Sequence, residues 1–187
     1  MKRIYVDTEY MYEAMFYERR MPKYNDKKQI IQIAAVLFDH DKGAEIESLD
    51  ILVKPIFHNN LPDFFIELTG INNKMIENKA IPFPKALKQF VKFCKNYPIW
   101  TFNNDYNVFL QNLKFHSIAN PFKCPFKKVK PLLKNFGINP KEYSSGTLYK
   151  AVGLNLKGHI HYALHDVRSM SQSMHSLEKN ANLPFLL

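Results

Sequence analysis

Residues 30–38, with the sequence IIQIAAVLF, form an almost continuously apolar run. A strand with one face in water alternates apolar and polar side chains, so this run predicts a central strand covered on both faces. A turn at residues 39–43 leads into residues 45–53, in which Leu49, Ile51 and Val53 alternate. Two strands joined by so short a turn predict an antiparallel hairpin. The chain must therefore build a sheet with packed layers on both sides of the central strand.

Other segments supply the remaining elements. Residues 4–10 and 97–102 are rich in β-branched and aromatic residues and predict two further strands. Residues 120–135 are basic and interrupted by proline, which indicates a loop around a short strand or helix. This order predicts an α/β fold, a mixed sheet with helices on both faces. Helices are expected at residues 72–78, after Pro84, at residues 105–113 and 147–152, and in a final segment where apolar residues recur from Ala163 to Leu177.

The composition is typical of a globular domain, because 46% of the residues are hydrophobic and 14% are aromatic. A length of 187 residues favours one domain, residues 1–187, large enough to bury a core. No long apolar run follows the first residues, so neither a signal peptide nor a membrane span is predicted. Cys94 and Cys124 lack metal-type spacing and suit a reduced compartment as buried apolar residues. We therefore expect a cytoplasmic protein without a disulfide framework.

The charge balance indicates a polyanionic partner. Lysine and arginine outnumber aspartate and glutamate by 26 to 17, which gives a net charge of +9. Nucleic acid is favoured over a membrane surface because no basic amphipathic helix stands out. Lys123, Lys127, Lys128 and Lys130 suit non-specific contacts with a phosphate backbone, although a solvated loop explains these lysines equally well.

Two carboxylates interrupt the first predicted strand. Side chains alternate along a strand, so Asp7 and Glu9 point to the same face. Two anions so close repel each other unless water or a cation lies between them. For this pair alone, a solvent-facing strand end is the favoured interpretation. The pair becomes informative only together with acids elsewhere in the chain.

Two more acids lie beside apolar segments. Asp105 follows the strand at residues 97–102, at the edge where α/β sheets place their sites, but a helix N-cap would also explain it. Asp166 lies on the flank of the final helix's apolar stripe, where its carboxylate can reach water. Taken together in a basic chain, Asp7, Glu9, Asp105 and Asp166 predict a dinuclear metal site. Mg²⁺ prefers carboxylate oxygens, and two such ions roughly 3.5–4 Å apart support phosphodiester cleavage.

At these residues the sequence resembles the DEDDh exonucleases of the DnaQ-like superfamily. The motifs occur in the family's order: DTE at residues 7–9, FIELTGI at 65–71, WTFNND at 100–105 and HYALHDV at 161–167. The segment at residues 147–154 is similar to the family's lead-in helix, and the resemblance extends from residue 2 to about residue 178. The sequence departs from the family at Tyr10-Met11, where many relatives have threonine two places after the glutamate. It departs again at Asn103 and Asn104, in place of a glycine or alanine.

The resemblance implies a ribonuclease H-like, five-stranded sheet, with three antiparallel strands followed by parallel ones. It also implies a 3′–5′ exonuclease that releases nucleoside 5′-monophosphates from RNA or single-stranded DNA with a free 3′ end. The compact length and the loop after Glu9 resemble most the single-domain, RNA-trimming branch. Two Mg²⁺ ions are expected as cofactors, with Mn²⁺ able to substitute, and protein partners are not indicated. The resemblance assigns metal binding to Asp7, Glu9, Asp105 and Asp166, and substrate contacts to Thr8, Tyr10, Phe65, Leu68, Thr69 and Gly70.

Two residues compete for the role of general base. His161 lies five residues before Asp166, as in the histidine branch of the superfamily, and an unperturbed imidazole accepts a proton near neutrality. Tyr162 lies four residues before Asp166, as in the tyrosine branch, and helix geometry alone favours it. Because Ala163 and Leu164 match the histidine pattern, we predict His161 as the base.

Two other functions remain open at the level of sequence. One is a nucleic-acid-binding module that has lost catalysis, which the intact set of four acids and a histidine argues against. The other is a protein-interaction domain with solvent-facing acids, which leaves the order of the motifs unexplained. Metal-dependent release of mononucleotides from an oligonucleotide distinguishes the three functions.

Overall fold

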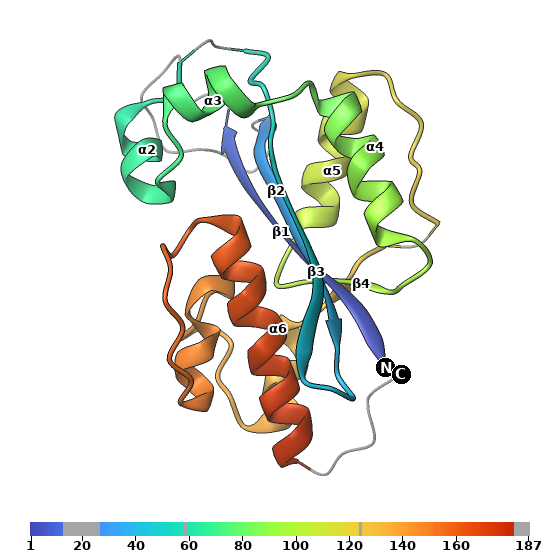
Figure 1. The fold of residues 1–187 in the computed structure, drawn as a ribbon, viewed down its shortest axis with the longest axis vertical. Coiled ribbons are helices and arrows are strands. Elements are labelled where there is room, and N and C mark those ends of the chain that lie inside the picture. Colours follow the sequence, from blue (N-terminus) through green and yellow to red (C-terminus); the bar gives the residue numbers. More distant parts are fainter. Residues whose placement is uncertain (13–26, 58–59, 124, 182–187) are drawn as a thin grey trace.

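The computed structural model describes residues 1–12, 27–57, 60–123 and 125–181, which form a five-stranded sheet in the order β3-β2-β1-β4-β5 (Figure 1). Strands β1, β2 and β3 pair antiparallel, and β4 and β5 continue the sheet in parallel with β1. This is the predicted ribonuclease H-like arrangement, and the predicted hairpin joins β2 to β3. The strands are β1 (Lys2–Tyr12), β2 (Lys28–Asp39), β3 (Ala44–Leu52), β4 (Ile99–Thr101) and β5 (Lys127–Lys128).

Helical segments cover both faces of the sheet, as predicted (Figure 1). Residues of β1 alternate between the two cores: Ile4 and Val6 pack with α4 and α5, whereas Tyr5 packs with α6. The central strand β2 is buried along nearly its whole length, because both of its faces are covered. The α-helices are α2 (Asp63–Thr69), α3 (Asn73–Lys79), α4 (Phe83–Cys94), α5 (Asp105–Phe115) and α6 (Ala163–Asn180), and η1 (Lys130–Phe136) and η2 (Ser145–Val152) are 3₁₀ helices.

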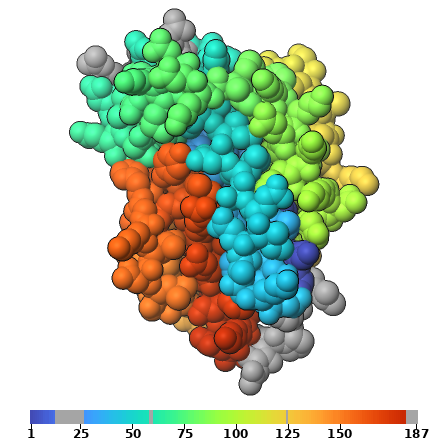
Figure 2. All heavy atoms as spheres, in the orientation of Figure 1, coloured from blue at the N-terminus to red at the C-terminus, as the bar shows by residue number. Residues whose placement is uncertain are grey.

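Strand β3 is an edge of the sheet. Figure 2 shows it at the surface between α6 and α4. Most of its residues are exposed, and only Ile51 and Leu52 at its end are buried. Glu45 and Glu47 alternate with the exposed Ile46 along this edge. Charged side chains on an edge strand disfavour pairing with a second chain.

Helix α2 is not among the helices expected from the sequence, in which residues 65–71 appear only as a family motif. The helix ends at Gly70, whose φ of 73° is the left-handed conformation that glycine adopts without steric cost. Phe65 packs in a third core, shared with α3, and Thr69 is buried, while Phe64 and Leu68 are exposed. So short a helix has little periodicity, and its N-cap, Pro62, gives no side-chain capping bond.

The far end of α6 is fixed by a buried network of charged side chains. Glu178 accepts a hydrogen bond from Nη1 of Arg3 at 2.5 Å, and its second oxygen lies 2.9 Å from Nδ1 of His40. Nε2 of His40 is 2.8 Å from the Tyr5 hydroxyl, and the Arg3 guanidinium lies over the Trp100 ring. The last turn of α6 is therefore tied to β1 and to the end of β2.

Two further sequence predictions concern the cysteines and the absence of a membrane span. Cys94 is buried in the core, as predicted, whereas Cys124 lies outside the described residues. No helix in the described part of the chain is long and apolar enough to cross a membrane.

Candidate active site

Asp7 and Glu9 occupy the part of β1 that faces α6. Both interact electrostatically with Asp166 on that helix, which agrees with the expectation that the two side chains share a face. Asp7 is buried, and Glu9 is partly buried, so the solvent-facing interpretation of this pair is wrong. The β1–β2 register shifts between Glu9 and Tyr10, so the strand leaves its regular pairing immediately after the two acids.

Asp105 begins α5 but does not cap it. The N-cap residue is Asn104, and the carboxylate of Asp105 points back to the sheet instead. Oδ1 of Asp105 accepts hydrogen bonds from the backbone N–H of Thr8 at 3.1 Å and from its hydroxyl at 2.6 Å. Oδ2 accepts one from the Thr101 hydroxyl. Two strands thus orient this carboxylate beside Asp7.

Asp166 lies in the first turn of α6 and is only 2% exposed, so its carboxylate does not reach water as a stripe-edge residue would. Its Oδ2 accepts a hydrogen bond from the Ser145 hydroxyl at 3.1 Å, and its Oδ1 accepts one from the backbone N–H of His161 at 3.2 Å. Gly146 permits this position, because a Cβ there would lie 2.3 Å from Oδ1 of Asp166. Helix η2 therefore closes the site over Asp166.

His161 reaches the cluster from the loop before α6. Its φ of 68° lies in the left-handed region, which few non-glycine residues adopt and which is concentrated at functional sites. One ligand atom from each of Glu9, His161 and Asp166 lies within 4.8 Å of the other two. The structure therefore brings the predicted histidine together with two of the predicted acids.

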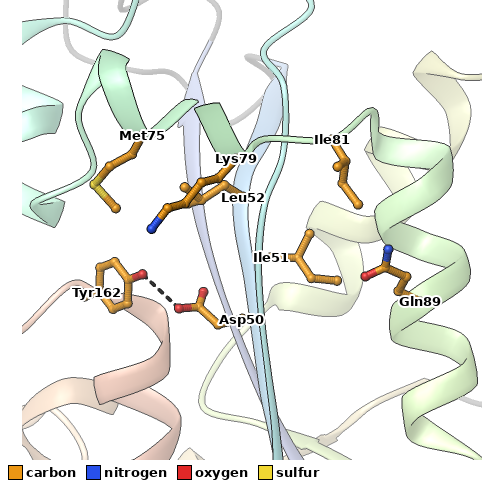
Figure 3. Close-up of a pocket in the computed structure, with 8 residues that line it drawn as sticks. All are labelled: Asp50, Ile51, Leu52, Met75, Lys79, Ile81, Gln89 and Tyr162. Carbon is orange, nitrogen blue, oxygen red and sulfur yellow. Dashed lines mark hydrogen bonds between the residues drawn. The ribbon is translucent and has the colours of Figure 1, made fainter. Parts of the chain in front are cut away.

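Tyr162, the competing base, is directed elsewhere. Its hydroxyl donates a hydrogen bond to Oδ2 of Asp50 on β3 at 2.8 Å (Figure 3). Tyr162 and Asp50 line a pocket of about 310 Å³ together with Met75, Lys79 and residues of β3 and α4. A phenol held at the sheet edge is turned away from the acids, although it precedes Asp166 by one helical turn.

The four acids disfavour one another's ionised forms. Burial raises the pKa of Asp7 well above its usual range, and the charges of Asp105, Asp166 and Glu9 raise it further. Burial also raises the pKa of Glu9 to about 9, with Asp166 and Asp105 adding to the effect. The pKa values of Asp105 and Asp166 are raised by burial, against hydrogen bonds from neighbouring hydroxyls that lower them.

This donor set fits a hard divalent cation. None of the four carboxylates forms an ion pair with a lysine or arginine among the described residues. A cation bound among them would remove the repulsion that raises their pKa values. Carboxylate oxygens are the ligands that Mg²⁺ and Mn²⁺ prefer.

The residues predicted to contact substrate fall into two groups. Thr8 and Thr69 are buried and hydrogen-bonded within the protein, and Phe65 is part of the core. Leu68 is 47% exposed and Gly70 is also exposed, while Tyr10 is partly buried. The end of α2 contacts the loop before α6, because a ring nitrogen of His159 lies 2.9 Å from the carbonyl oxygen of Leu68.

Three of the predicted phosphate-binding lysines lie along β5 and the start of η1. Nζ of Lys128 donates to the side chain of Asn104, the residue before Asp105, at 2.9 Å. Lys127 lies over the Trp100 ring and Lys130 over the Phe102 ring. These cations border the β4–α5 turn that carries Asp105, whereas nothing in the structure assigns a contact to Lys123.

Sequence reasoning missed the residues that hold the acids. Ser145 and Gly146 lie just before the lead-in helix identified in the sequence, and only the fold brings them against Asp166. Thr101 supports Asp105 from β4. A serine followed by glycine before a predicted helix was the available signal, but it is equally typical of an ordinary turn.

Comparison of the sequence with models of known protein families identifies the family of this chain. A family model named RNase_T, described as exonuclease, matches residues 11–172. The chain belongs to this exonuclease family. The match contains Asp105, His161 and Asp166, whereas Asp7 and Glu9 precede it. The predicted membership in an exonuclease family is thereby confirmed.

Curated relatives of this RNase_T member are much longer proteins. The PolC-type DNA polymerase III of Streptococcus pneumoniae is 29% identical over 147 residues, which are 78% of this chain and 9% of the polymerase. The chain thus spans less than a tenth of the curated relatives it matches.

Solved structures share the fold at low sequence identity. The nuclease domain of 3'hExo, a DEDDh family member bound to rAMP, superposes with a TM-score of 0.81 at 17% identity, over 96% of this chain and 92% of that one. Cell-death related nuclease 4 gives 0.77 at 19% identity, over 96% and 64%. Exonuclease I of E. coli in complex with single-stranded DNA gives 0.68 at 16% identity, over 96% and 40%.

Proposed function

We propose that this protein is a divalent-metal-dependent 3′–5′ exonuclease that releases nucleoside 5′-monophosphates from RNA or single-stranded DNA. The observation that carries the proposal is the cluster itself: Asp7, Glu9, Asp105 and Asp166 come from three separate elements, with His161 beside them. The DEDDh structure with rAMP and the exonuclease I complex with single-stranded DNA support a nucleic-acid substrate.

In this proposal some of the residues would bind the metal ions, and His161 would transfer a proton. The four carboxylates would hold two Mg²⁺ ions, with Thr8, Thr101 and Ser145 keeping the acids oriented. The bound ions would supply positive charge that activates water and stabilises the departing oxygen. His161 would accept the proton of the attacking water. That water forms the new bond to phosphorus as the bond to the 3′ oxygen of the preceding nucleotide breaks, and the 3′ oxygen takes a proton from solvent.

The polarity of digestion provides a direct test. An oligonucleotide blocked by a 3′-phosphate or an inverted 3′ nucleotide should resist digestion, whereas a 5′ block should have no effect. Binding should weaken steadily with added salt if lysines such as Lys127 and Lys128 contact phosphates. Matched RNA and DNA strands, with and without Mg²⁺, are compared by release of mononucleotides. Rapid cutting of a circular single strand would exclude an exonuclease but leave a metal nuclease, and binding without any cleavage would indicate a nucleic-acid-binding module.

Bound metal should raise the melting temperature of the protein, and the stability of the metal-free protein should depend on pH. The pKa of Glu9 is about 9 in the folded chain against an ordinary 4.5, so the folded state retains the proton longer. The metal-free protein should therefore lose stability as the pH rises from 4.5 to about 9. At about 100 times its Kd, Mg²⁺ or Mn²⁺ should add roughly 2.7 kcal/mol and raise the melting temperature by about 5–11 °C.

Asp7→Asn separates the metal effect from general salt effects. Removing one charge relieves the repulsion among the acids, so the metal-free variant should melt above the metal-free wild type. The same substitution removes a ligand, so its metal-induced shift should shrink. Identical melting of the wild type in EDTA and in millimolar Mn²⁺ would contradict the metal site.

A further inference from the structure

Gln32 is the polar residue inside the apolar run of the central strand β2. It is fully buried, and a buried amide is costly unless its polar atoms find partners. In the β1–β2 ladder Gln32 lies directly opposite Glu9. Directly opposed residues of an antiparallel pair share a face, so the Gln32 side chain lies on the same side of the sheet as the acid cluster.

The amide of Gln32 joins β2 to two other elements. Its Oε1 accepts a hydrogen bond from the backbone N–H of Ala163, the first residue of α6, at 2.9 Å. Its Nε2 donates to Oδ1 of Asp50 on β3 at 2.7 Å. The second oxygen of Asp50 accepts from the Tyr162 hydroxyl. Both ends of the amide are therefore used, and both lead to the start of α6.

These partners allow only one orientation of the amide. The backbone N–H of Ala163 can only donate, and an ionised Asp50 can only accept. Oε1 of Gln32 must therefore face the helix and Nε2 must face the strand. Figure 3 shows Asp50 with Tyr162 at the end of this chain of bonds.

Helix α6 has no cap of its own at this end. Its N-cap residue, Tyr162, makes no side-chain capping bond, so the first N–H groups of the helix need partners from elsewhere. Gln32 supplies one from across the interface. The residue before Tyr162 is His161, in its left-handed conformation, and Asp166 follows within the first turn.

We propose that Gln32 is a positioning residue of the nuclease site: its amide, locked by Asp50, fixes the start of α6 and so aligns His161 with Asp166 and Glu9. The inference rests on the proposed function, because alignment matters for the rate only if His161 takes part in catalysis. Displacement of a catalytic group by about 1 Å costs on the order of 10²-fold in rate.

The test replaces Gln32 by methionine, which has a similar length but no amide. Gln32→Met should lower kcat about 10- to 100-fold with KM little changed, since the side chain is fully buried. Gln89→Met is the matched control: it makes the same chemical change at an exposed glutamine of α4, near Asp50, and should leave kcat unaltered. Asp50→Ala removes the acceptor of the Gln32 amide and should lower kcat. In Asp50→Asn the side-chain oxygen can still accept from the amide, so this variant should keep kcat close to that of the wild type.

A second readout does not depend on activity. The ring signal of His161 in a proton–carbon NMR spectrum is identified by its loss in His161→Ala. It should move in Gln32→Met and Asp50→Ala and stay in place in Gln89→Met and Asp50→Asn. A folded Gln32→Met with wild-type kcat and an unmoved His161 signal would overturn the inference. If Gln32→Met does not fold, Asp50→Ala decides by the same two measurements. If the wild type releases no nucleotides, the proposed function fails, and the His161 signal alone still tests the positioning role.

Discussion

His161→Ala should lower the rate of nucleotide release by on the order of 10²–10⁴, the contribution typical of a positioned general base. The imidazole lies with Glu9 and Asp166 in one cluster, so it is placed either to accept a proton or to bind a cation. The two roles differ in their effect on stability. If His161 is a general base, His161→Ala should keep the metal-induced rise in melting temperature, because the four carboxylates remain. If His161 is a metal ligand, His161→Ala should lose much of that rise.

Tyr162→Phe provides the comparison in the neighbouring residue. Its hydroxyl is bonded to Asp50 rather than to the acids, and Gln32 still holds the start of α6 without it. The variant should therefore retain activity near that of the wild type in the same assay. A nearly inactive Tyr162→Phe beside an active His161→Ala would reverse the assignment and place the chain's chemistry with the tyrosine branch.

Glu178→Ala should destabilise the fold by about 3–5 kcal/mol, the usual cost of removing one partner of a buried ion pair. The Arg3 and Glu178 side chains are only 1% and 2% exposed, so water cannot replace the lost carboxylate. Burial acts to raise the pKa of Glu178, but hydrogen bonds from His40 and Arg3 outweigh it and hold the pKa below its ordinary value. For a chain of this size the melting temperature should fall by about 6–20 °C.

An exposed ion pair provides the control for this prediction. Glu47 on β3 lies 3.9 Å from Nζ of Lys95, and both side chains are more than half exposed. Such pairs contribute about 0–1 kcal/mol, so Glu47→Ala should melt close to the wild type. Calorimetry or circular dichroism in metal-free buffer keeps the result independent of the acid cluster. If the two variants melt alike, the buried network contributes no more than a surface contact.

The sheet could be predicted from the sequence because the patterns that indicate its strands are local. The apolar run of β2 and the alternation of Leu49 and Ile51 predict the hairpin without knowledge of any other part of the chain. Helix α2 escapes prediction because it is short and lacks a capping side chain. Its end at Gly70 appears in the sequence only as part of the FIELTGI motif.

The acids could be predicted as a set, but not their surroundings. Asp105 has the sequence signature of an N-cap, and only the docking of β4 against β1 shows that Thr8 and Thr101 orient it. The same limit applies to Gln32, whose partner Ala163 lies far along the chain. Contacts of this kind depend on tertiary structure, which local propensity does not encode.

The distribution of the acids along the chain has a consequence during synthesis. Asp7 and Glu9 are made first, Asp105 follows, and His161 and Asp166 arrive only with the loop before α6 and the first turn of that helix. Because chains emerge at roughly 5–20 residues per second, the ribosome carries an incomplete cluster for most of the time it takes to translate this region. A nascent chain that ends before His161 has neither the histidine nor the fourth carboxylate, so under the proposed function it should be inert towards the messenger from which it is being read.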